Sequence, residues 1–385
     1  MKYAYRLGKA MMLPVACLPV AGLLMGIGYW MDPVGYGANC LPAQILIQAG
    51  SALINHMSLL FALGVATGLA DEQDGTAALA GVAAWIMIQN ILTPANVQII
   101  TGGRTDPSSF QDIDNQMIGI LCGMLGASCS NRYRKKELFR GSLMFSGRRL
   151  AVLTAAGYAG IVSLVLLVIW PCFYEGSVYV GRSLLGTGSI GAGIYMFLNR
   201  LMIPTGLHHA LNSVFWFDLA GISDLKSFWA GTGVYGQTGQ YMTGFFPVMI
   251  FGLPGAALAI YQTARKEKKK MTGGLLMTAA ACSLLTGVTE PMEFSFMFLA
   301  PGLFFLHAFL TGISGFICAA LPFRIGFNFS AGLMDYFMAL NSPMAENPWL
   351  LWPVGTVFGV LYYAVFRFCI LRFGLKTPGR EDGQE

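Results

Sequence analysis

Charged residues are scarce in this sequence. Asp, Glu, Lys and Arg together make up 11% of the 385 residues, whereas soluble proteins carry about 25%. Hydrophobic residues reach 55%, and the mean hydropathy is +0.59. These values exclude an ordinary soluble domain. They indicate an all-α polytopic membrane protein, because a helix satisfies its backbone hydrogen bonds within one segment.

The sequence also lacks paired cysteines. None of its eight cysteines belongs to a Cys-x-x-Cys pair, and most lie in apolar runs. Such cysteines usually behave as small buried hydrophobic residues, so we expect no disulfide, no metal site and no bound cofactor. The net charge of +5 does not indicate nucleic-acid binding either, since the basic residues lie in short loops between apolar segments.

Apolar runs of spanning length follow one another along the chain. A helix needs about 20 apolar residues to cross a bilayer, and this rule predicts about ten spanning helices plus two broken segments. Two local expectations follow from the pattern. Residues 93–115 are polar and are expected to form a loop, while residues 150–170 and 181–198 are expected to be separate spans.

Positive charge marks the cytoplasmic side of a membrane protein. The segment 131–149 carries seven Arg and Lys residues, and residues 265–270 and the C-terminal tail are also basic. We therefore expect these segments and the N-terminus to be cytoplasmic. We take the first basic segment as marking the divide between two halves, residues 1–170 and 171–373. A tail over 374–385 follows the second half.

One apolar region is interrupted by an acid next to a proline, in Thr286-Gly-Val-Thr-Glu-Pro-Met-Glu-Phe294. Proline disfavours helical geometry in the residue before it, so we expect Glu290 to lie in a break between two helices. A carboxylate at membrane depth needs a partner or water, which predicts a polar site with Glu290 and Thr289. Glu293 would then stand at the third helical position, where we expect it to cap free amides.

A second interruption occurs at Pro204. If a short helix restarts there, His208 and Asn212 share one face because they are four residues apart. Arg200 precedes the break; it either belongs to the site or extends to the membrane interface. Interrupted apolar segments point to a transporter site. Arg donates, carboxylate accepts and His or Asn does both, which suits a ligand covered with hydroxyls.

Two further polar residues carry alternatives. His307 lies in an apolar run without neighbouring polar residues in the sequence, and we expect a packing role for it. Asp335 is expected either to line the cavity or to cap a helix.

These motifs resemble a known family. Asn199-Arg-Leu-Met-Ile-Pro-Thr-Gly-Leu-His-His209 and Gly287-Val-Thr-Glu-Pro-Met-Glu-Phe294 are similar to the two signatures of the membrane component, IIC, of phosphotransferase-system (PTS) sugar transporters of the glucose superfamily. The resemblance extends from Leu13-Pro-Val-Ala-Cys-Leu-Pro-Val-Ala-Gly22 to the segment 375–382. Within the family, the run from Pro204 to Phe217 is most similar to the N-acetylglucosamine branch.

The resemblance implies a homodimer in a bacterial cytoplasmic membrane, in which residues 1–170 form the scaffold and 171–373 carry the sugar. The broken segments would be re-entrant hairpins near 200–220 and 273–308. Arg200, His208 and Glu290 would contact the sugar, together with Asn212 and Thr289. Glu290 and His208 would lie beside the hydroxyl that receives phosphate and serve as the catalytic residues.

The family also implies the reaction. A phosphorylated IIB domain donates phosphate from a cysteine in a Cys-x-Thr-Arg-type motif, which this sequence does not contain, so we expect the chain to act with IIB as part of a sugar phosphotransferase. The expected partners are N-acetylglucosamine, IIB, a second copy of the chain and membrane lipid. Specificity for glucose or another hexose, an ion-coupled sugar transporter and a passive channel remain as alternatives.

Overall fold

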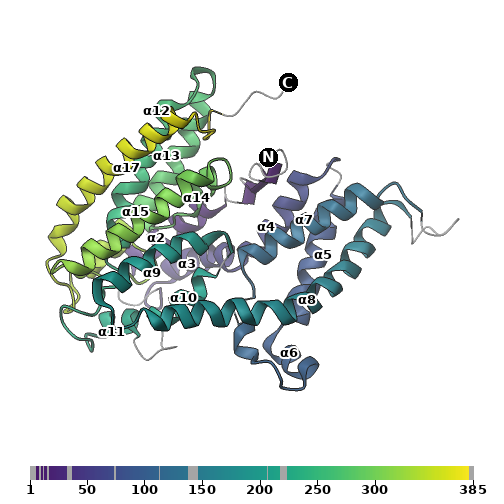
Figure 1. The fold of residues 1–385 in the computed structure, drawn as a ribbon, viewed down its shortest axis with the longest axis horizontal. Helices are drawn as coiled ribbons and strands as arrows, with labels where there is room; N and C mark the ends of the chain where they lie inside the picture. Colours follow the sequence, from purple (N-terminus) through teal and green to yellow (C-terminus); the bar gives the residue numbers. More distant parts are fainter. Residues whose placement is uncertain are drawn as a thin grey trace. The chain divides into compact units, whose positions relative to one another are not determined.

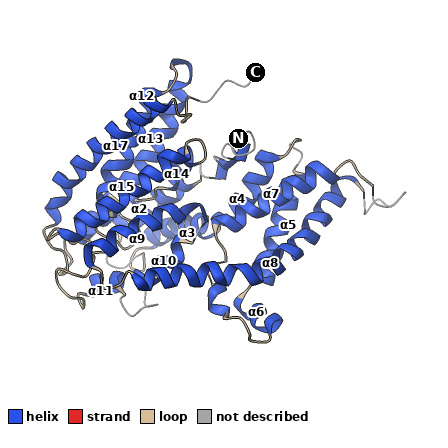
Figure 2. Cartoon of the chain, viewed as in Figure 1, coloured by secondary structure: helices blue, strands red, loops and turns tan. Residues whose placement is uncertain are grey.

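The computed structural model describes residues 6–7, 10–11, 13–14, 17–32, 37–72, 75–111, 113–137, 146–205, 207–216 and 223–380. Within these ranges the regular elements are all helical (Figure 2). The middle of the basic segment 131–149, the end of the tail and residues 217–222 of the first expected hairpin lie outside the description. The chain divides into two compact units.

The first unit is assembled from Met1–Val15, Asn55–Tyr179 and Ile203–Ala210. Its helices are α4 (Met57–Leu69), α5 (Thr76–Ile91), α6 (Pro94–Thr101), α7 (Gln116–Tyr133) and most of α8 (Gly147–Ser183). Helix α7 packs against α4 and α5 (Figure 1). Glycine permits this close approach: a Cβ atom on Gly126 would lie 2.6 Å from the Cα of Gly81. The small residues of 76–84 therefore allow close helix contact, as expected from their size.

Two sequence-based boundaries in this unit are wrong. Residues 93–115 are not one loop, because α6 begins within them. Thr93 caps α6 by accepting a hydrogen bond from the amide of Asn96, and Pro94 occupies the first turn, which is a favoured start for a helix. Residues 150–183 lie in one helix of 37 residues, α8, which continues through Pro171. A proline removes one backbone donor and here does not end the helix.

The second unit comprises Ala16–Ile54, Val180–Met202 and Leu211–Glu385. Helices α9 (Gly188–Met202) and α15 (Pro301–Ala320) lie side by side in it (Figure 1). Their contact is made through glycines: a Cβ atom on Gly193 would lie 3.0 Å from the carbonyl oxygen of Gly312. The other helices lying wholly or mainly in this unit are α2 (Leu18–Met31), α3 (Leu41–Asn55), α10 (His208–Phe215), α11 (Asp224–Ala230), α12 (Leu253–Thr263), α13 (Lys269–Thr286), α14 (Glu290–Met297), α16 (Leu333–Ala339) and α17 (Leu351–Phe373).

Three described helical segments are long and apolar enough to cross a membrane: α8, α15 and Pro348–Phe373. The number rises to five if the interrupted pairs α3 with α4 and α5 with α6 each count as one span, and α5 and α6 are bent by 65°. The described helices thus agree with a polytopic membrane protein. The total of about ten spans stays a prediction.

Candidate functional site

Both predicted breaks are present. Helix α13 ends at Thr286, and Gly287 follows with a φ of 76°, a conformation that glycine adopts without steric penalty. Helix α14 then begins at Glu290, one residue earlier than the position expected for its start. On the other segment, α9 ends at Met202 and α10 begins at His208. Each break is thus followed by a short helix that begins with a polar residue, His208 in α10 and Glu290 in α14.

Arg200 and Glu293 form a buried ion pair in the second unit. The Arg200 Nη1 atom lies 2.8 Å from Glu293 Oε1 and also donates to the Thr289 hydroxyl at 2.8 Å. The exposed fractions of the two charged side chains are 6% and 0%. The guanidinium carbon also lies 4.8 Å from the centre of the Phe245 ring, in a cation–π contact. Arg200 is therefore held inside the unit and does not extend to a membrane interface.

The pair continues into α15 and α17 through two further side chains. His307 Nε2 lies 3.0 Å from Glu293 Oε1, and His307 Nδ1 lies 3.0 Å from the Tyr362 hydroxyl. The Tyr362 hydroxyl also lies 3.3 Å from the Thr311 hydroxyl. Since an ionised carboxylate only accepts, Nε2 of His307 carries the proton that faces Glu293. Arg200, Thr289, Glu293, His307 and Tyr362 are called the arginine network below.

The arginine network corrects two sequence-based assignments. Glu293 does not cap its helix; its carboxylate binds a cation from α9 and a histidine from α15. His307 is a buried and satisfied residue, as expected, but it has specific polar partners rather than packing contacts alone. A signal was available for both: ionisable residues inside apolar segments usually pair with one another, and Arg200, Glu293 and His307 all lie in such segments.

Glu290 differs from Glu293 in its surroundings. It is half-buried, and within the described chain no other side chain donates a hydrogen bond to its carboxylate. It opens α14, where the first amides of a helix favour negative charge. The two acids thus differ in their partners: Glu293 is engaged by side chains of α9 and α15, whereas a ligand contact of Glu290 stays a prediction.

Asn212 belongs to a separate polar group of the second unit. Its Oδ1 atom accepts from the Tyr195 hydroxyl at 2.9 Å and from Asn199 Nδ2 at 2.6 Å. The Tyr195 ring packs on Phe215, with ring centres 4.2 Å apart. These contacts fix the Asn212 amide on the second turn of α10.

His208 opens α10 and is buried, and Asn212 follows it on the same helix. His208 falls in the first unit, whereas Arg200, Thr289 and Glu290 fall in the second. Its proximity to Glu290 stays a prediction. The side chain of His209 lies outside the description.

Asp335 has a structural role. Its Oδ1 atom accepts from the amide of Asn328 at 2.7 Å, and its Oδ2 atom accepts from the amide of Ser330 at 3.1 Å. The carboxylate thereby holds the loop that precedes α16. Asp335 was expected either to line the cavity or to cap a helix, but α16 has Gly332 as its N-cap and no side-chain cap hydrogen bond. The carboxylate holds the loop 328–330 instead of capping a helix.

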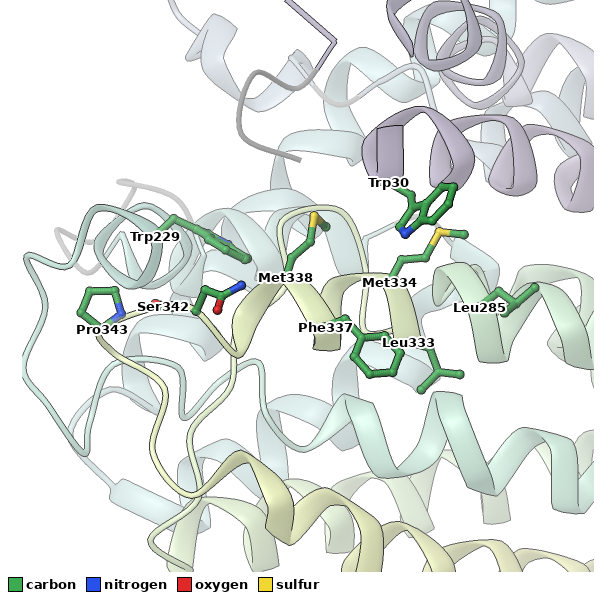
Figure 3. A pocket seen from close by; sticks show the side chains of 10 residues that line it. Trp30, Trp229, Leu285, Leu333, Met334, Phe337, Met338, Ser342 and Pro343 are labelled. Atoms are coloured by element: carbon green, nitrogen blue, oxygen red, sulfur yellow. The ribbon is translucent and has the colours of Figure 1, made fainter. Parts of the chain in front are cut away.

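A cavity of about 720 Å³ lies elsewhere in the second unit (Figure 3). Trp30 and Met334 approach each other at one end, and Trp229 and Pro343 lie at the other. Its remaining lining residues are Leu285, Leu333, Phe337, Met338, Asn341 and Ser342. Because the lining is mainly apolar and includes none of the predicted site residues, this cavity does not supply the donors and acceptors that a hydroxylated ligand needs.

Comparison with known proteins places the chain in one family. Residues 8–312 match the family model described as "Phosphotransferase system, EIIC". The chain therefore belongs to the EIIC family of the phosphotransferase system, the class of membrane sugar-transport components.

Three relatives match almost the whole chain. The "PTS system N-acetylglucosamine-specific EIIC component" of Streptomyces coelicolor is 39% identical over 99% of this chain and 93% of its own length. The EIICB component of the same description from Bacillus subtilis is 38% identical over 99% of this chain and 80% of its own length. The EIICBA component from Escherichia coli is 38% identical over 99% of this chain, which spans 56% of that relative.

Proposed function

We propose that this chain binds N-acetylglucosamine, carries it across the bacterial cytoplasmic membrane and presents its 6-hydroxyl to a phosphorylated IIB domain. The relatives that match 99% of the chain are described as N-acetylglucosamine-specific. The structural observation that supports the proposal is the break between α13 and α14. There Glu290, to which no other described side chain donates, follows Thr289, which binds the buried Arg200.

Each predicted residue has a role that suits its chemistry. Arg200, Thr289 and Asn212 supply donors and acceptors to sugar oxygens. Glu290 accepts the proton of the 6-hydroxyl as its oxygen attacks phosphorus, and His208 lies beside that hydroxyl. The bond between phosphorus and the IIB cysteine sulfur breaks as the new P–O bond forms, so the sugar leaves as its 6-phosphate.

The transport step is proposed to be a movement of one half of the chain. Residues 171–373 carry the sugar against a scaffold of residues 1–170, which also forms a homodimer in the lipid bilayer. Rigid-body motion of one bundle against another is common in transporters built on broken helices. The termini and the basic segment 265–270 lie on the cytoplasmic side, where positive charge attracts an acidic partner.

Binding and phosphorylation assays on purified protein test this function. We expect N-acetylglucosamine to bind more tightly than glucose, and its phosphorylation to require phosphorylated IIB. Tighter binding of another hexose would overturn the specificity. Accumulation of unmodified sugar driven by a pH gradient without IIB would favour an ion-coupled transporter, and uptake that is insensitive to both would indicate a channel.

A crosslink tests the movement. Two cysteines, one in each half, are introduced into a variant whose eight native cysteines have been replaced. Locking them together is expected to abolish transport while sugar binding remains measurable. Full transport by the locked protein would contradict the moving-half mechanism, and the reduced form of the same variant is the control.

A further inference from the structure

Among the described residues, the arginine network engages one nitrogen of the Arg200 guanidinium. In the described part of the chain, Nη1 donates to the Thr289 hydroxyl and to Glu293 Oε1. Nε is buried and has no partner within the described chain. Nη2 likewise donates to none of the described residues. The edge formed by Nε and Nη2 therefore offers two parallel donors, the arrangement in which Arg binds two oxygens at once.

The rest of the network determines where this edge points. The Phe245 ring covers one face of the guanidinium at 4.8 Å and restrains its plane. Glu293 holds the Nη1 corner at 2.8 Å. Glu293 is held in turn by His307, which is held by Tyr362 on α17. The orientation of Arg200 thus depends on side chains from α14, α15 and α17.

Stability alone is a poor explanation for such a network. A buried ion pair adds little net stability, and apolar residues of similar volume often replace one without loss. A network that served only structure would also be expected to satisfy its buried polar atoms. Here neither Arg200 Nε nor Glu293 Oε2 has a partner among the residues that the structure describes.

We propose that Glu293, His307 and Tyr362 are positioning residues that aim the Nε–Nη2 edge of Arg200 at two neighbouring oxygens of the sugar. Glu293 is assigned to positioning because its Oε1 atom is engaged by Arg200 Nη1 and His307 Nε2, so that it acts through Arg200. Pre-organising the donors reduces the conformational freedom lost on binding. The proposal rests on the proposed function in one respect: the ligand must be a sugar. Any hexose would do, because every hexose carries neighbouring oxygens that could accept from the two Arg200 donors.

The decisive variant is Tyr362→Phe, which keeps the buried ring and removes the hydroxyl at the far end of the network. The matched control is Tyr336→Phe. Tyr336 is also buried, and its hydroxyl is hydrogen-bonded to the Pro348 carbonyl and the Trp352 indole, outside the arginine network. We expect Tyr362→Phe to raise the sugar Kd and KM about tenfold, equivalent to about 1.4 kcal/mol. The turnover of Tyr362→Phe at saturating sugar is expected to change less than about twofold. The Kd, KM and turnover of Tyr336→Phe should also change less than about twofold, which corresponds to about 0.4 kcal/mol.

A double variant tests whether the effect passes through Arg200. Lys in place of Arg200 keeps the charge but lacks the planar pair of donors. In the Arg200→Lys background, Tyr362→Phe is therefore expected to have no further effect on Kd. Independent, additive losses would overturn the proposal, as would a lowered melting temperature of Tyr362→Phe with an unchanged Kd. Unchanged KM with reduced turnover would also overturn it.

The test remains separate from that of the proposed function. Kd is measured without IIB, using the hexose that the unsubstituted protein binds most tightly. If that hexose is not N-acetylglucosamine, or if IIB is not required for transport, the proposed function fails while the comparison of Tyr362→Phe with Tyr336→Phe still decides the role of the network.

Discussion

Arg200 and Glu293 are joined at 2.8 Å although 93 residues separate them in the chain. The pair places the end of α9, which precedes the break near Pro204, beside α14, which follows the break after α13. It also distinguishes the two acids of the segment 286–294, Glu290 and Glu293. Glu293 pairs with Arg200, and Glu290, three residues earlier, is the acid that we propose contacts the sugar.

Glu290→Gln is expected to lower IIB-dependent phosphorylation by about 10²–10⁴-fold, because the amide cannot accept the hydroxyl proton. The fold should persist, since no other described side chain donates to this carboxylate. Sugar phosphorylation rate and melting temperature are the measurements. Glu175→Gln, at an exposed position of α8, is the control, and a normal rate for Glu290→Gln would refute its role.

His208→Ala is expected to weaken sugar binding about tenfold, the loss of one good hydrogen bond, about 1.4 kcal/mol. His209→Ala should change the affinity less, because adjacent residues on a helix point in different directions. Titration of both purified variants with N-acetylglucosamine compares them directly. The opposite order would show that the neighbouring imidazole binds the sugar.

Gly126→Ala is expected to destabilise the first unit by about 1–3 kcal/mol through overpacking. The added Cβ atom would lie 2.6 Å from the Gly81 Cα and 2.9 Å from the Ala77 carbonyl oxygen, so α5 and α7 would have to separate. The control is Gly160→Ala in α8, where a Cβ atom meets no other atom within 4 Å. That variant should be unchanged or more stable by about 0.5–1 kcal/mol. Melting curves in detergent measure both, and equal melting temperatures would contradict the tight contact.

Arg324→Ala is expected to destabilise the second unit by more than about 3 kcal/mol, because each buried carbonyl left without a donor costs about 1–3 kcal/mol. The guanidinium donates to five carbonyl oxygens, those of Gly236, Cys318, Ala319, Leu321 and Phe323. Arg104→Ala removes an exposed arginine and should change the stability by less than about 0.5 kcal/mol. Similar melting temperatures for the two variants would show that water replaces Arg324.

The sequence alone was sufficient for the class of protein and for the two interruptions. Low charge and long apolar runs predict a membrane protein because they reflect the solvent that surrounds the chain. The break near Pro204 and the break just before Glu290-Pro291 follow from the local geometry of proline and glycine. Helix boundaries within the first unit were less predictable. Whether a polar stretch such as 94–101 forms a helix, or Pro171 ends one, depends on capping and packing as well as on composition.

Only the tertiary structure decided the roles of the buried polar residues. In the sequence, Glu293 has the spacing of a helix cap and His307 stands in an apolar run. Their partners come from 93 residues away, for Glu293 and Arg200, and from 55 residues away, for His307 and Tyr362. The cost of burying a charge predicts that some partner exists. Which partner it is depends on how the close contact of α9 with α15 and the position of α17 bring distant side chains together, and no local pattern in the chain contains that information.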